Sequence, residues 1–154
     1  MSPQRPTGGA HDIHHRGIKE QAQQHEPASD RQPRPFSPAV RAGDFIYVSG
    51  QVPANAEGEI VAGGIEAQTR QVMQNLKRVL SGCKLTLEDV VAARVFLTRF
   101  ERDYAAMNRV YAGYFASDKR PARTCVGVTA LARGALVEID FIARRVPARR
   151  PARR

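Results

Sequence analysis

Cysteine is scarce in this sequence, and long apolar runs are missing from it. The two cysteines of the 154-residue chain, Cys83 and Cys125, stand far apart and form no C-x-x-C pair. This pattern argues against a disulfide framework and against a zinc site, since both need paired thiols. No apolar run approaches the ~20 residues that a membrane-spanning helix requires, and the first residues lack the apolar centre of a secretory signal. We therefore expect a soluble, cytoplasmic protein.

Histidine is confined to the first 35 residues. Three of the four histidines lie in the string HDIHH, at positions 11, 14 and 15. Residues 1–35 contain almost no large apolar side chains, so we expect a flexible extension in which a physiological metal site is improbable. Residues 36–144 hold no histidine that could activate a nucleophile or serve in an acid/base pair.

The positive charge is concentrated at the C-terminus. The formal net charge is +9, and residues 144–154 supply six arginines without an acid, whereas residues 1–35 hold five basic and four acidic side chains. Residues 36–143 thus carry only +2. We expect one folded domain, residues 36–144, followed by a solubilising basic tail, residues 145–154, and nucleic-acid binding is not indicated for the folded part.

The first half of the folded part predicts two strands and a helix. An apolar strand is expected at Phe45–Ser49, and a short second strand is expected after a hairpin turn at Glu57 and Gly58. A helix that ends at Gly82 follows, because apolar side chains recur at helical spacing. Its stripe consists of Ile65, Thr69, Val72, Met73, Leu76, Val79 and Leu80.

The second half predicts a strand, a helix and two closing strands. The first of these strands has two largely apolar faces, one with Val91, Ala93, Val95 and Leu97 and the other with Val90, Ala92, Arg94 and Phe96. Asp103 is expected to cap the helix, whose stripe is Tyr104, Met107, Tyr111, Tyr114 and Phe115. The closing strands are expected at Arg123–Val128 and Leu136–Arg144.

This order of elements indicates an α+β fold with one sheet and two helices on one face. Two helices cannot cover both faces of such a sheet, and the second face is too apolar to meet water as a broad patch. Candidates for that face are Phe45 or Tyr47, Phe96 or Val95, and Phe141 or Ile142. Burial between subunits would solve the problem, so we expect a homo-oligomer.

Several strings, in order, resemble the RidA (YjgF) family of reactive intermediate or imine deaminases over about residues 35–144. They are FSPAVRAGDFIYVSGQVP, IEAQTRQVMQNLKRVL, DVVAARVFLTRFERDYAAMNRVYAGYF, RPARTCVGV and GALVEIDFIA. The resemblance implies a chorismate-mutase-like mixed sheet in a homotrimer, with clefts between subunits. It also implies hydrolysis of 2-imino acids and enamines, such as 2-iminobutanoate and 2-iminopropanoate, to 2-oxo acids and ammonia without a cofactor or metal.

The resemblance also implies the site residues. Arg123 would bind the substrate carboxylate, and the backbone at Cys125 together with Glu138 would position the attacking water. Four residues would line the same region as substrate-binding groups: Phe36, Ser49, Gly50 and Asn108. The chain departs from the family where Phe36 replaces the usual tyrosine and Pro38 an often-found glutamine, which leaves the substrate range open.

The residues themselves support this chemistry and leave alternatives. A guanidinium suits a carboxylate because its planar fork bonds both oxygens, and we expect a nearby Arg123 to keep Glu138 ionised as a base that orients water. A purely structural Arg123–Glu138 ion pair remains an alternative. So do a non-catalytic trimer that binds a small ligand or a protein, and an RNA-directed activity. Cys125 is not expected to act as a nucleophile, and the tyrosines of the second helix are expected in the core.

Overall fold

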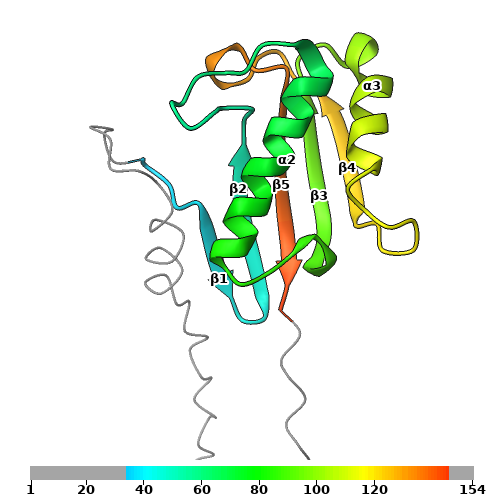
Figure 1. Ribbon diagram of the computed structural model, residues 1–154. Coiled ribbons are helices and arrows are strands. Elements are labelled where there is room, and N and C mark those ends of the chain that lie inside the picture. The colour runs from blue at the N-terminus through cyan, green and yellow to red at the C-terminus, as the bar shows by residue number, and fades with distance from the viewer. Residues whose placement is uncertain (1–33, 146–154) are drawn as a thin grey trace, which may run out of the picture.

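The computed structural model describes residues 34–145, which form one five-stranded sheet with two helices on the same face (Figure 1). The order in the sheet is β1-β2-β5-β3-β4. The strands are β1 (Ala39–Ala42), β2 (Phe45–Gln51), β3 (Val90–Leu97), β4 (Ala122–Gly127) and β5 (Val137–Arg144). The helices are α2 (Gly64–Gly82) and α3 (Phe100–Ala112), with short 3-10 turns at Leu87–Asp89 and Ala132–Gly134. The predicted α+β class, with a single mixed sheet and two helices on one face, is confirmed.

The sheet is mixed because of its outermost pair. Strand β5 lies between β2 and β3 and is antiparallel to both, whereas β4 runs parallel to β3. A parallel pair needs a long crossover, which α3 supplies. In this way α3 is held beside the edge strand β4, and the two elements can together present side chains at one edge of the molecule (Figure 1).

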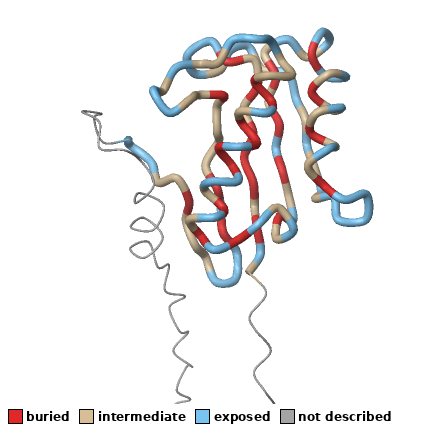
Figure 2. Tube along the Cα trace, in the orientation of Figure 1, coloured by how far each residue is buried: buried red, intermediate tan, exposed pale blue. Residues whose placement is uncertain are grey.

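Helix α2 covers the middle of the sheet, as its apolar stripe predicts. Val72, Met73, Leu76 and Leu80 are fully buried against the strands, and Figure 2 shows buried positions along this helix and along the central strands behind it. Alternation along β5 places Val137, Ile139 and Phe141 in this core. The opposite sheet face has no helix over it among the described residues, and there Phe45 and Tyr47 are exposed.

The strand that pairs with β2 on its outer side differs from the prediction. It is β1, just before the turn at Gly43, whereas the segment after Gly58 forms only an isolated bridge between Ala54 and Ile60. Gly43 has a φ of +59°, so the turn between β1 and β2 uses a conformation that glycine adopts readily. Strand β1 has only four residues, too few for an alternation of apolar and polar side chains to be recognised in the sequence.

Two further local predictions were wrong. Asp103 does not cap α3, because the helix begins earlier at Phe100; its carboxylate is 2% exposed and pairs with Arg102 at 2.7 Å. In β3, Val90 is buried and Val91 is exposed, the reverse of the expected alternation, because the register with β5 shifts between Val90 and Ala92. From Ala93 onward the predicted alternation is confirmed.

The predicted extensions lie largely outside the described residues, and so does the histidine string at positions 11–15. Among residues 34–145, no helix is long and apolar enough to cross a membrane. Within the same range there is no cluster of three or more histidine, cysteine, aspartate or glutamate side chains that could hold a metal ion.

Candidate functional site

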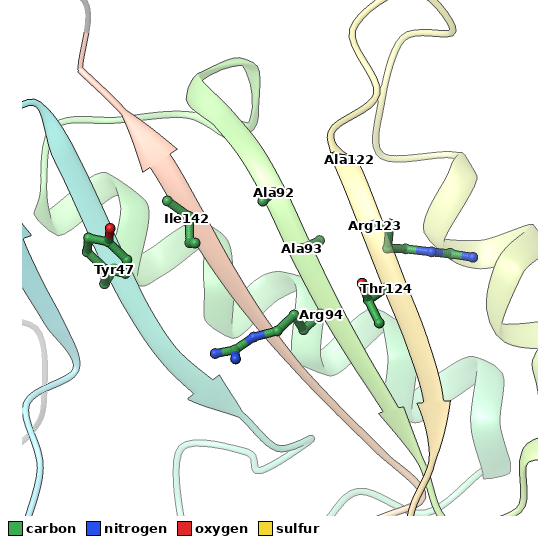
Figure 3. A pocket seen from close by; sticks show the side chains of 8 residues that line it. All are labelled: Tyr47, Ala92, Ala93, Arg94, Ala122, Arg123, Thr124 and Ile142. Atoms are coloured by element: carbon green, nitrogen blue, oxygen red, sulfur yellow. The ribbon is translucent and has the colours of Figure 1, made fainter.

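Arg123 lies on the helix-covered face of the sheet, at its outer edge. In the register of β3 and β4 it stands beside Ala93, which is buried under the helices, while Thr124 stands beside Arg94 on the opposite face. Figure 3 shows the Arg123 side chain leaving β4 in a direction away from Arg94. The edge position leaves the guanidinium half-buried, between solvent and the core.

The guanidinium of Arg123 rests on an aromatic ring of α3. Its Cζ atom lies 4.9 Å from the ring centroid of Tyr111, within the range of a cation–π contact. Among residues 34–145, Arg123 has no hydrogen-bond or ion-pair partner. By contrast, Arg94 on the other face makes a two-pronged bond to Asp140, with Nε–Oδ1 at 3.0 Å and Nη2–Oδ2 at 2.9 Å. The N–H groups of Arg123 are thus available to an anion.

Two other predicted residues gather at this edge. Cys125 follows Arg123 on the same face of β4; burial raises the pKa of its thiol, and the charge of Arg123 opposes that shift. A thiol with a raised pKa is a poor nucleophile at neutral pH, in agreement with its predicted non-nucleophilic role. Asn108 lies on α3 three residues before Tyr111, and its buried side-chain oxygen accepts no hydrogen bond from the described residues.

Glu138 projects from the opposite face of the sheet. In the register it stands beside Phe96, on the face without helices, and not beside the buried Val95. Its carboxylate lies against the backbone of β2: a Cβ atom on Gly50 would be 2.0 Å from Oε1 of Glu138. The pairing of β2 with β5 is irregular between Val48 and Gln51, which brings Gly50 to this position.

Ser49 and Phe36 lie near the same strand end. The Ser49 hydroxyl donates a hydrogen bond to the carbonyl oxygen of Ser37 at 2.6 Å, and the Ser49 amide donates one to Pro38 at 2.9 Å. These bonds hold residues 37–38 along the end of β2. Phe36, the residue before them, is 54% exposed. Ser49 therefore fixes the chain that carries Phe36, and its hydroxyl proton is already engaged.

The direction of the pKa shift of Glu138 differs from the expectation. Burial raises the pKa of its carboxyl group, and the neighbouring negative charge of Asp140 raises it further. Arg123 does not contribute, because the two side chains lie on opposite faces. The expectation that a nearby Arg123 keeps Glu138 ionised is therefore wrong for the single chain. For the same geometric reason, the two residues form no ion pair within one chain.

The predicted site residues thus form two groups that one chain does not bring together. The arginine group, on the helix-covered face at the sheet edge, consists of Asn108, Arg123 and Cys125. The glutamate group, at the end of β2 and on the open face, consists of Phe36, Ser49, Gly50 and Glu138. The charged residue of each group, Arg123 in the first and Glu138 in the second, makes no side-chain hydrogen bond with residues 34–145.

The open face also carries a cavity of about 370 Å³ (Figure 3). It crosses β2, β5, β3 and β4, and the side chains that β3 and β4 present to it from the open face are apolar apart from Arg94 and Thr124. The lining residues are Tyr47, Ala92, Ala93, Arg94, Ala122, Arg123, Thr124 and Ile142. The cavity does not include Glu138, so it does not join the two groups of predicted residues.

Sequence reasoning missed two features of these groups. Tyr111 was assigned to the core, and it is indeed only 6% exposed, but it also supports Arg123. Its spacing of three residues from Asn108 was a usable signal, because residues three apart share a helix face. The pairing of Arg94 with Asp140 had no such signal, since it depends on the register of β3 with β5.

Comparisons with known proteins point to a single family. The family model described as endoribonuclease L-PSP matches residues 26–145. A RutC family protein of Pyrococcus horikoshii is 44% identical over 110 residues, which is 71% of this chain and 86% of that protein. The 3-aminoacrylate deaminase RutC of Acinetobacter baylyi is 42% identical over 110 residues, again 71% of this chain and 86% of that protein.

A solved structure shares the fold. The crystal structure of Escherichia coli TdcF with bound serine superposes with a TM-score of 0.68 at 31% identity, and the match covers 75% of this chain and 91% of TdcF. The sequence relatives thus include a protein named as a 3-aminoacrylate deaminase. The structural relatives include TdcF, whose structure was solved with bound serine.

Proposed function

Because this chain belongs to the endoribonuclease L-PSP family, also known as the RidA or YjgF family, we propose that it hydrolyses 2-imino acids and their enamine tautomers, such as 2-iminobutanoate and 2-iminopropanoate, to 2-oxo acids and ammonia. The observation that carries the proposal is the half-buried guanidinium of Arg123, which has no polar partner among residues 34–145. A half-buried charge of this kind favours an anion of complementary shape. The relative from Acinetobacter is named for the deamination of an enamino acid, which also carries a carboxylate.

Arg123 anchors the substrate through its carboxylate. Two parallel N–H···O bonds hold the carboxylate in the plane of the guanidinium, and they thereby fix the direction of the adjacent imine carbon. Asn108, three residues before Tyr111 on α3, lines the same site in this proposal. Fixing the reacting carbon in this way contributes to the rate through orientation.

Glu138 moves the protons. Water attacks the carbon of the protonated imine and gives one proton to Glu138, and the nitrogen of the resulting carbinolamine takes a proton back. The C–N bond then breaks to release ammonia, while the hydroxyl group loses its proton and becomes the C=O of the 2-oxo acid. A carboxylate suits both steps, because it can accept the proton of the water and return it to nitrogen. Gly50 allows the carboxylate to occupy its place beside β2.

The two groups of residues act together only if a second copy of the chain supplies one of them. Arg123 and Glu138 leave opposite faces of the sheet, and the open face exposes Phe45 and Tyr47. Packing of the open face against neighbouring copies, as in the homotrimer typical of the family, would bury these rings and could place the arginine group of one copy beside the glutamate group of another. We propose that the sites lie between subunits.

An RNA-directed activity is suggested by the description of the family model. The charge of the folded part speaks against it, because residues 36–143 carry only +2 and contain no histidine for general acid/base cleavage of a phosphodiester. An RNA cleavage assay with the purified protein tests this alternative directly.

The decisive experiment is a coupled assay. A pyridoxal-phosphate dehydratase generates 2-aminoacrylate or 2-aminocrotonate, and the loss of imine absorbance is followed with and without this protein. We expect wild-type protein to accelerate the loss, and Glu138→Gln to lower kcat more than it raises KM while the oligomer persists. Absence of any acceleration by a correctly folded, oligomeric wild-type protein would refute the proposal in favour of a non-catalytic binding role.

A further inference from the structure

Arg123 stands at the outer end of a row of aromatic rings. Its guanidinium lies over Tyr111 at 4.9 Å, Tyr111 meets Phe115 at 5.0 Å between centroids, and Phe115 meets Phe141 edge-on at 6.2 Å. Phe141 is 1% exposed, in the middle of the core. The row therefore connects the guanidinium to the buried core, through side chains that have only two rotatable bonds each.

Among residues 34–145, the guanidinium of Arg123 makes no hydrogen bond or ion pair, and its ring contact is with Tyr111. An arginine side chain loses considerable rotamer freedom when a ligand fixes it. A guanidinium that already rests on a ring loses less of that freedom on binding. A cation–π contact engages no N–H group in a hydrogen bond, so the N–H groups stay available for both oxygens of a carboxylate.

We propose that Tyr111 is a positioning residue, whose ring restrains the Arg123 guanidinium at the sheet edge and so favours its binding of a substrate carboxylate. This inference rests on the proposed function in assigning the carboxylate to Arg123. The ring carries the effect, and the hydroxyl does not: that group is buried and makes no hydrogen bond with the described residues. Burial raises the pKa of Tyr111 to about 12, so the ring under the cation is the neutral phenol at neutral pH.

Variants of Tyr111 separate the ring from the hydroxyl. Tyr111→Leu removes the ring, and we expect KM for 2-iminobutanoate and the Kd for 2-oxobutanoate, measured by calorimetry, to rise about 3- to 30-fold, the range of a partly buried cation–π contact. The effect on kcat should be smaller. The conservative variant Tyr111→Phe should restore most of the affinity. Tyr104→Leu, at the exposed ring of the same helix, is the matched control and should leave both constants unchanged.

A double-mutant cycle tests whether Tyr111 acts through Arg123. In an Arg123→Ala background, Tyr111→Leu should weaken 2-oxobutanoate binding by less than about twofold, because the group that the ring supports is gone. Full additivity of the two effects would overturn the proposal. So would equal losses in Tyr111→Phe and Tyr111→Leu, since the hydroxyl would then carry the effect.

A spectroscopic measurement keeps the inference independent of activity. The side-chain N–H protons of Arg123, whose Cζ atom lies over the Tyr111 ring, should resonate upfield of those of other arginines in the NMR spectrum, and Arg123→Lys assigns the signal by its loss. Absence of the upfield shift in folded wild-type protein overturns the positioning role, even if the leucine variant fails to fold. An upfield shift in a protein that neither binds 2-oxobutanoate nor hydrolyses imines would support the contact and refute the proposed function alone.

Discussion

Glu138 and Gly50 touch across the junction of β5 and β2, with no room for a side chain between them. A Cβ atom on Gly50 would lie 2.0 Å from Oε1 of Glu138 and 2.9 Å from its carboxyl carbon. Real Cβ atoms do not approach other atoms so closely, so any substitution at Gly50 must displace the carboxylate. The position of a proposed proton-transfer group therefore depends on a glycine in a neighbouring strand.

Gly50→Ala should therefore lower imine hydrolysis about as much as Glu138→Gln while the fold survives. The displaced atoms belong to the end of a flexible side chain, so the cost in the free energy of unfolding should stay near ~1 kcal/mol. Turnover and melting temperature are measured on the same preparation. Gly113→Ala is the control: its φ is −67° and its Cβ atom would meet only the Val110 carbonyl at 3.4 Å, so neither quantity should fall appreciably. Wild-type turnover in Gly50→Ala would show that the carboxylate position is not critical.

Arg123→Ala should reduce kcat/KM by about 30-fold to several thousand-fold. Removing one partner of a buried charge pair costs roughly 2–5 kcal/mol, and about 1.4 kcal/mol corresponds to each factor of ten. Arg123→Lys should recover little, because an ammonium cannot hold both carboxylate oxygens in one plane. The same preparations are checked by melting temperature and mass, and an intact oligomer of Arg123→Ala with wild-type turnover would refute the assignment.

Tyr111 should make the fold sensitive to alkali. Burial raises its pKa from 10.0 to about 12, and Arg123 only partly opposes this shift. A group whose pKa is higher in the folded state supports stability fully below its unfolded pKa, here about 10, and loses that contribution as the pH rises toward the folded value. The free energy of unfolding of Tyr111→Phe should therefore exceed that of wild type increasingly between pH 10 and 12, by an amount that approaches ~2–3 kcal/mol.

Melting curves at a series of pH values measure this difference. Tyr104→Phe is the control, because it removes the same hydroxyl group from a tyrosine that is 38% exposed. The melting temperature of this variant should follow that of wild type at each pH. If wild type and Tyr111→Phe lose stability in parallel above pH 10, the burial of the phenol does not set the alkaline limit.

The open sheet face should be the contact between copies. Tyr47, 48% exposed in the single chain, lies on this face beside Ile142. Light scattering at micromolar concentration should give the mass of a homotrimer for wild type and a smaller mass for Tyr47→Glu, because a carboxylate would be buried without a partner. Tyr104→Glu, on α3, should keep the wild-type mass. A monomeric mass for the wild type would contradict the prediction outright.

Residues 35–146 should suffice for folding and activity. The described chain is fastened near both ends: the Ser49 amide bonds to Pro38, and the Arg145 amide bonds to Asp44 at 2.8 Å. Arg145 also donates from its side chain to the Cys83 carbonyl, so a truncation must retain it. A chain truncated to residues 35–146 should keep the melting temperature, mass and turnover of the full chain. Loss of the oligomer on truncation would give the ends a structural role.

The prediction of elements from sequence succeeded where periodicity was long. Helix α2 follows its apolar stripe, which extends over four turns, and ends at Gly82 as expected. Short segments were less informative: β1 has four residues, and the irregularity at Val90 reverses which of two valines is buried. Asp103 was read as a helix cap because aspartate often is one, but the helix starts three residues earlier and uses that carboxylate to bind Arg102.

The sequence by itself determined the α+β class, the family and the identity of the candidate residues, because these follow from local periodicity and from strings of residues in order. Only the tertiary structure decided which of these residues can meet. Sheet register places Arg123 over Tyr111 on one face and Glu138 against Gly50 on the other. A shift of one residue in either strand would exchange the faces, and no local pattern fixes a register between strands that lie far apart in the chain.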